Sequence, residues 1–337
     1  MPSREKSRNF FSTIALCVAI VLAFPAQAKV IRVVGTEFTH KAVSERQLRA
    51  QVEFLCDSLC DGRGTGTPGA SEATAWLVRH FRDLGLKAFG EGYVRSFRTP
   101  DGSLGRNVIG WLPGNKKDAY VIVTAHYDGL GRLDGRLYPG ADSNASGVAA
   151  LLGLCSMSRE LQRIGKAWRK NIIFVALDGK NQGLSGSRAL WNLLESGALV
   201  DPETGRPVRG DEVTLVVNID QVGSTLSPLK SGRKDYLILL SAGAADYHRG
   251  SLRTQNDKYG LGLDLGWDYY GSSSFTQLFY ERVSDQRPFL EHGRPAVMFT
   301  SGITLNNNQI RDTPDTLDYT VLKKRIWLIF HWLERVV

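Results

Sequence analysis

The chain has 337 residues, of which 42% are hydrophobic and 23% charged, with a formal net charge of +8. These proportions are ordinary for a globular protein. The basic residues are scattered, and their densest groups lie at 116–117 and 323–325. We therefore expect a solvated surface and no nucleic-acid partner.

The first 28 residues form a pattern of their own. Arg4, Lys6 and Arg8 precede an apolar run over 10–24, and the small residues of 26–28 fit a cleavage site. This pattern predicts a secretory signal peptide over 1–28. No other stretch approaches the roughly 18 apolar residues that a membrane span needs. We expect an exported protein, periplasmic or secreted, without a stable membrane anchor after cleavage.

Hydrophobic runs and their boundary residues predict alternating helices and strands after residue 40. Helices are predicted over 44–55, 72–84, 148–154, 187–194, 284–290 and 317–333. Strands are predicted over 94–97, 107–112, 121–125, 171–177, 213–219, 236–240 and 296–300. Gly-rich loops are predicted over 60–70 and 261–279, the second of them facing a substrate.

Strands that alternate with helices predict an α/β fold with a mostly parallel, mixed sheet flanked by helices on both faces. No linker, composition shift or internal repeat divides the chain after residue 40, so we expect a single domain over 40–337. Cys56 and Cys60 are four residues apart on a predicted helix and would share a face, and Cys155 belongs to the core.

The stretch 121–151 carries the candidate chemistry. His126 and Asp128 follow a buried strand, and Asp142 lies before a predicted helix. Asp220 follows a later buried strand. Since ligands bind at the carboxyl edge of an open α/β sheet, we expect these side chains to meet there. An imidazole with nearby carboxylates suits a transition metal, and Asp128 is placed to orient His126.

Seven segments together resemble metallopeptidase family twenty-eight, the co-catalytic zinc aminopeptidases that include bacterial leucyl aminopeptidases. They are CDGRGTGTPGA, AHYDGLG, YPGADSNASGVAALL, IIFVALDGKNQGLSGSRAL, NIDQVG, SDQRPFLEHGRPAVMF and RDTPDTLDY. The resemblance spans roughly 48–329 and implies a zinc-exopeptidase-like sandwich of helices and sheet.

The resemblance also implies site residues. One zinc ion would be held by His126, Asp142 and Asp220, with Asp128 orienting His126. Asp142 would bridge to a second metal.

The rest of the family's site departs from its usual pattern. Lys180 stands where the family has its general base, a Glu. Asn181 stands at a metal-binding Glu, and Asp312 stands at a metal-binding His.

These departures change the chemistry that we expect. A cation at Lys180 opposes metal binding and cannot take a proton from water unless burial strongly lowers its pKa. Asn181 offers a neutral amide oxygen, whereas Asp312 can still supply a carboxylate. We expect one zinc ion rather than two, with a metal-free site as the alternative. Lys180 would either fill a vacated metal position through a salt bridge to Asp142 or Asp312, or, held neutral, take a catalytic role at the general-base position.

Three functions stay open from the sequence. The first is exported, zinc-dependent hydrolysis of amino-terminal residues from peptides or a similar small substrate. The second is an inactive relative that binds peptides or a protein partner without turnover. The third, acyl transfer of the glutaminyl-cyclase kind, depends on the half of the site that is altered here. The aromatic group 267–270 either lines a substrate pocket or packs in the core.

Overall fold

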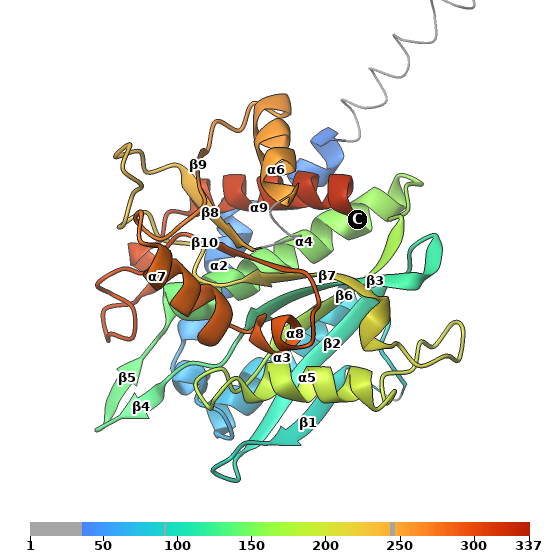
Figure 1. The fold of residues 1–337 in the computed structure, drawn as a ribbon. Helices are drawn as coiled ribbons and strands as arrows, with labels where there is room; N and C mark the ends of the chain where they lie inside the picture. Colours follow the sequence, from blue (N-terminus) through green and yellow to red (C-terminus); the bar gives the residue numbers. More distant parts are fainter. Residues whose placement is uncertain (1–35, 91, 243–246) are drawn as a thin grey trace, which may run out of the picture.

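The computed structural model describes residues 36–90, 92–242 and 247–337. Within them an eight-stranded sheet has the order β1-β2-β6-β3-β7-β10-β8-β9. Neighbours β6, β3, β7 and β10 are parallel, and β9 is parallel to β8, whereas the pairs β1–β2, β2–β6 and β10–β8 are antiparallel. The predicted mostly parallel, mixed sheet is therefore confirmed (Figure 1).

The strands have the following bounds: β1 Val94–Arg98, β2 Leu104–Leu112, β3 Lys116–His126, β4 Gly131–Leu133, β5 Arg136–Tyr138, β6 Lys170–Leu177, β7 Val213–Ile219, β8 Tyr236–Ser241, β9 Asp264–Gly266 and β10 Ala296–Thr300. The α-helices are α2 Glu45–Cys56, α3 Pro68–Asp83, α4 Ser146–Arg163, α5 Ser185–Glu195, α6 Tyr247–Lys258, α7 Ser273–Gln277, α8 Arg287–Glu291 and α9 Tyr319–Val336. None of the helices in the described ranges is both long and apolar enough to cross a bilayer.

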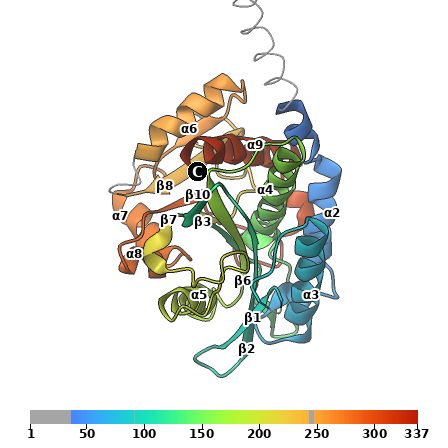
Figure 2. The ribbon, with the colours of Figure 1, turned by 90° about the vertical axis from the view of Figure 1, so that its right-hand side faces the viewer.

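Helices cover both faces of the sheet, as expected for strands buried on two sides (Figure 2). On β3, Val121 and Val123 point to the face covered by α2, α4 and α9, whereas Ile122 points to the face covered by α5 and α8. This alternation follows from the two-residue repeat of a strand. The sheet is thus held between two apolar layers.

Several boundaries differ from the sequence prediction. α3 begins at Pro68, because the Thr67 hydroxyl accepts from the Ala70 N–H at 3.2 Å and proline suits the first helical position. The predicted loop 60–70 was therefore wrong at its end, where residues 68–70 belong to α3. α2 ends at Cys56, so Cys56 and Cys60 do not share a helix, and both are free thiols.

The predicted loop 261–279 was also wrong in part, since it contains β9 and α7. Helix α6 was not predicted, because its sequence YHRGSLRTQNDK is largely polar and lacks a helical repeat of apolar residues. Its Leu252 is nevertheless buried, and α6 packs against α9.

The parallel strands bring their carboxyl ends to one edge. His126 ends β3 opposite Leu177 of β6, and Asp220 follows the end of β7. The buried Arg63 braces the loops at this edge, donating to the carbonyl oxygens of Tyr127 at 2.7 Å, Pro139 at 2.8 Å and Gly140 at 2.9 Å. The fold therefore delivers the predicted site residues to a fixed place.

Candidate functional site

Lys180 reaches the site through the turn that follows β6. Gly179 has a φ of 72°, a conformation that side chains other than glycine rarely adopt. After this turn, the backbone N–H groups of Lys180 and Asn181 both donate to the Asp128 carboxylate at 3.1 Å. Asp128 therefore fixes the loop that carries Lys180, in addition to facing His126.

The Lys180 ammonium lies between His126 and Asp220. It donates to Oδ2 of Asp220, and its Nζ is 3.1 Å from Nε2 of His126. The side chain of Lys180 is 16% exposed and that of Asp220 is 4% exposed. The predicted salt bridge to Asp142 or Asp312 is therefore wrong, since Lys180 pairs with Asp220.

Carboxylates keep Lys180 charged. Burial acts to lower its pKa, but Asp220 and Asp285 outweigh burial and raise the pKa above its ordinary value. Burial likewise acts to raise the pKa of Asp220, whereas the Lys180 ammonium and His126 hold it below its ordinary value. The two groups form a buried ion pair at neutral pH.

His126 has no free nitrogen lone pair in this arrangement. Its Nδ1 lies 3.3 Å from Oδ1 of Asp128 and 3.1 Å from the Asp128 carbonyl oxygen. Burial and Lys180 act to lower the pKa of His126, but Asp128 and Asp220 raise it to about 9. In the neutral form Nε2 accepts from Lys180, and in the charged form Nε2–H faces Oδ1 of Asp220 at 3.4 Å.

Asp142 takes no part in this ion pair and is held by different partners. Its Oδ1 accepts from the Ser146 hydroxyl at 3.0 Å and from the Gly223 N–H at 2.8 Å, whereas its buried Oδ2 has no hydrogen-bond partner among the described residues. Burial and the neighbouring Asp312 raise the pKa of Asp142 to about 7. The Asp312 carboxylate itself accepts from the backbone N–H groups of Asp142 and Ser143.

Asn181 does not point toward Asp142 or Asp312. Its side-chain amide donates to Oδ2 of Asp128 at 3.1 Å. The interpretation of Asn181 as a weak metal ligand therefore has no support in its orientation.

We tested whether these residues fit a zinc ion. Zinc needs a deprotonated imidazole and carboxylates at about 2.0–2.2 Å. Here Nε2 of His126 and Oδ2 of Asp220 are both engaged by Lys180. No group of three His, Cys, Asp or Glu side chains in the described ranges is arranged to hold a metal. The site as arranged does not fit zinc, because the Lys180 ammonium takes the place that the metal cation would need.

Asp285 belongs to the same cluster, and the sequence analysis did not single it out. It is fully buried, and neither carboxylate oxygen has a hydrogen-bond partner in the described part of the chain. Burial raises its pKa to about 6, while His126 and Lys180 act to lower it. The signal available from the sequence was its place in SDQRPF, one of the segments that carry the family resemblance.

A cavity of about 170 Å³ adjoins this cluster, and His126, Lys180 and Asp220 supply its charged lining. The rest of its lining is apolar side chains and neutral amides and hydroxyls: Tyr269, Phe279, Val283, Met298, Ile303, Ser143, Asn181, Gln221, Ser284, Asn307 and Asn308. Tyr269 comes from the predicted aromatic group, so that group lines a pocket in part.

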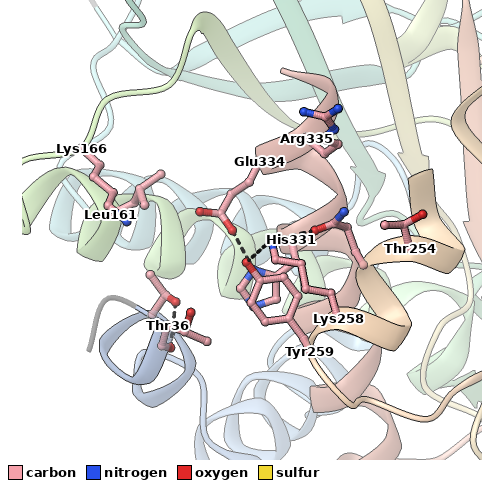
Figure 3. Close-up of a pocket in the computed structure, with 11 residues that line it drawn as sticks. Thr36, Leu161, Lys166, Thr254, Lys258, Tyr259, His331, Glu334 and Arg335 are labelled. Atoms are coloured by element: carbon pink, nitrogen blue, oxygen red, sulfur yellow. Dashed lines mark hydrogen bonds and ion pairs between the residues drawn. The ribbon is translucent and has the colours of Figure 1, made fainter. Parts of the chain in front are cut away.

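A larger hollow of about 450 Å³ lies elsewhere, between the ends of α6 and α9 (Figure 3). Its Glu334 carboxylate accepts from Nδ1 of His331 at 2.6 Å, and Lys166, Lys258 and Arg335 line its rim. It contains none of the predicted site residues, so we place the functional site at the smaller cavity.

The chain belongs to peptidase family M28. The model of this family matches residues 107–333, which is more than half of the chain. A probable zinc metalloprotease from Pyrenophora tritici-repentis is 24% identical over 288 residues, 76% of this chain. The chain spans 62% of the length of that curated relative.

Solved structures share the fold. The aminopeptidase LapA of Legionella pneumophila is 15% identical, with a TM-score of 0.66 over 88% of this chain and 73% of its own. The glutaminyl cyclase of Macrostomum lignano is 18% identical, with a TM-score of 0.68 over 89% of this chain and 92% of its own. The predicted family and fold are confirmed, and the fold is shared by relatives named for hydrolysis and for cyclisation.

Replacing Asp285 by Asn should change how stability depends on pH. Asp285 binds its proton more tightly in the folded chain, so its ionisation destabilises the fold as the pH rises through about 6. Between pH 4 and pH 8, the unfolding free energy of Asp285→Asn should therefore rise relative to the wild type by roughly 3 kcal/mol. Urea unfolding across this pH range measures the difference, and a difference that does not vary with pH would contradict the assignment.

Proposed function

We propose that this chain is an exported member of family M28 that binds peptides without hydrolysing them. The observation that carries the proposal is the Lys180 ammonium, which donates to Asp220 and lies 3.1 Å from His126. A charged lysine cannot act as a general base, and it engages the groups that a metal would need. The pocket is kept while the means of activating water is lost.

The chemistry of the cavity supports a peptide ligand. Tyr269, Phe279, Val283 and Met298 offer an apolar surface for a ligand side chain. The neutral amide side chains that line the cavity can form hydrogen bonds with peptide groups. One N–H of Lys180 serves Asp220, and the group remains partly exposed to the cavity. A ligand carbonyl or carboxylate oxygen can therefore accept from Lys180.

Zinc-dependent aminopeptidase activity is the second candidate. It is favoured by Oδ2 of Asp142, a buried carboxylate oxygen without a partner in the described residues. One zinc ion held by His126, Asp142 and Asp220 would give that oxygen a ligand role. This requires Lys180 to leave its ion pair with Asp220, and breaking a buried pair costs about 3–5 kcal/mol.

Binding and turnover are measured separately. With Leu-Gly-Gly as the probe, calorimetry should detect binding to the wild type, and no free leucine should appear with or without added zinc. Val283→Asp should weaken binding about tenfold or more, because it places a charge in the apolar wall. Val200→Asp is the matched control, since Val200 is 41% exposed and Val283 40% exposed, and it should leave binding unchanged.

Zinc-dependent release of leucine by the wild type would establish the second candidate and contradict the first. Absence of binding to Leu-Gly-Gly and to a pool of other tripeptides would also contradict the proposed function.

The export proposal rests on residues 1–28, which lie outside the described residues. If it is correct, bacteria expressing the full chain should yield a periplasmic or secreted product whose amino-terminal residue is Lys29. An intact amino terminus in the cytosolic fraction alone would contradict export.

A further inference from the structure

One short segment contributes side chains to the cavity and to a second hollow. α7 and the π-helical turn η5 (Leu278–Arg282) form a wall whose Phe279 lines the cavity. An outer hollow of about 510 Å³ is lined by the apolar side chains of Phe275 and Leu278 together with Ser272, Ser274, Gln277 and Arg282. The same segment thus contributes to both spaces, at the edge of the molecule where Figure 1 shows α7.

Aromatic rings connect the cavity to this outer hollow. The ring of Tyr269 is 5.3 Å from that of Phe279, and Phe279 is 4.7 Å from Phe275, measured between centroids. Tyr269 is 1% exposed, whereas Phe275 is 37% exposed. These distances are ordinary for packed aromatic rings, so the rings of Tyr269, Phe279 and Phe275 form one packed group that includes residues of the cavity and of the outer hollow.

Hydrogen bonds hold this segment in place. The Ser272 hydroxyl accepts from the Phe275 N–H at 3.3 Å, and the Thr276 hydroxyl accepts from the Tyr269 N–H at 2.8 Å. Exposed apolar side chains on a braced segment lose little further conformational freedom when a ligand covers them. This makes the wall a suitable contact surface.

The size of the cavity points to a longer ligand. Pockets that bind a complete small molecule enclose about 300–1,000 Å³, whereas this cavity holds about 170 Å³, enough for one side chain. A ligand that fills only this space buries little area. The adjoining exposed apolar side chains of Phe275 and Leu278 offer the additional area.

We propose that the outer hollow is a second binding site, which takes an apolar side chain of a polypeptide whose first side chain occupies the cavity. This inference rests on the proposed function, and it makes the ligand a polypeptide segment rather than a free amino acid or dipeptide. The backbone of the bound segment crosses the wall formed by α7 and η5. Specificity then depends on two apolar residues at a fixed separation.

The test uses hexapeptides of glycine and serine with leucine at position 1, alone or with a second leucine at position 2, 3 or 4. Calorimetry with the wild-type chain should show that one peptide with two leucines binds about tenfold or more tightly than the peptide with one, as expected for burying a second leucine. Leu278→Ser should remove this gain while leaving the affinity for the one-leucine peptide unchanged, because Leu278 lines the outer hollow and not the cavity. Leu278→Ile should keep most of the gain.

Phe38→Ser is the matched control, because Phe38 is 42% exposed and lies outside both the cavity and the outer hollow. It should keep the full gain. Binding of the one-leucine peptide without any gain from a second leucine, or a gain that persists in Leu278→Ser, would overturn the second site and leave the proposed function standing. Failure of every peptide to bind the wild type would overturn both.

Discussion

The ion pair between Lys180 and Asp220 determines what this site can do. Asp220 is nearly inaccessible to solvent and needs a positive partner, since an unpaired buried carboxylate is costly. In a zinc peptidase a metal ion would meet that need. Here the ammonium of Lys180 meets it from within the chain, and it lies 3.1 Å from Nε2 of His126, the imidazole nitrogen that faces the same position. The remaining features of the site follow from this substitution.

Asp128 shows how the substitution is stabilised. It faces His126, and it also accepts from both backbone N–H groups and the side-chain amide of the loop 180–181. A residue whose family role is to orient a metal ligand thus also fixes the position of the replacement cation. Asp142 and Asp285 have unpartnered buried oxygens in the described residues, and burial raises the pKa of both carboxyl groups, with Asp312 adding to the rise at Asp142.

The sequence predicted the sheet well because buried parallel strands are nearly continuous apolar runs. β7 and β10 match their predicted ranges, and His126 and Asp220 lie at strand ends as expected. Polar elements were harder, and α6 was missed because its helical form depends on packing against α9. Side-chain partners were hardest of all. The sequence indicated that Lys180 would replace a metal, but the choice of Asp220 over Asp142 depends on the turn at Gly179 and on the Asp128 contacts.

The zinc content of the purified mature chain tests the central claim most directly. After equilibration with zinc and dialysis at neutral pH, the wild type should retain far less than one ion per chain, because Lys180 occupies the position of the cation. Lys180→Ala frees His126 and Asp220 and should bring retention to about one ion per chain, as for a site with three protein ligands. One tightly held zinc ion in the wild type, lost on His126→Ala, would contradict the account.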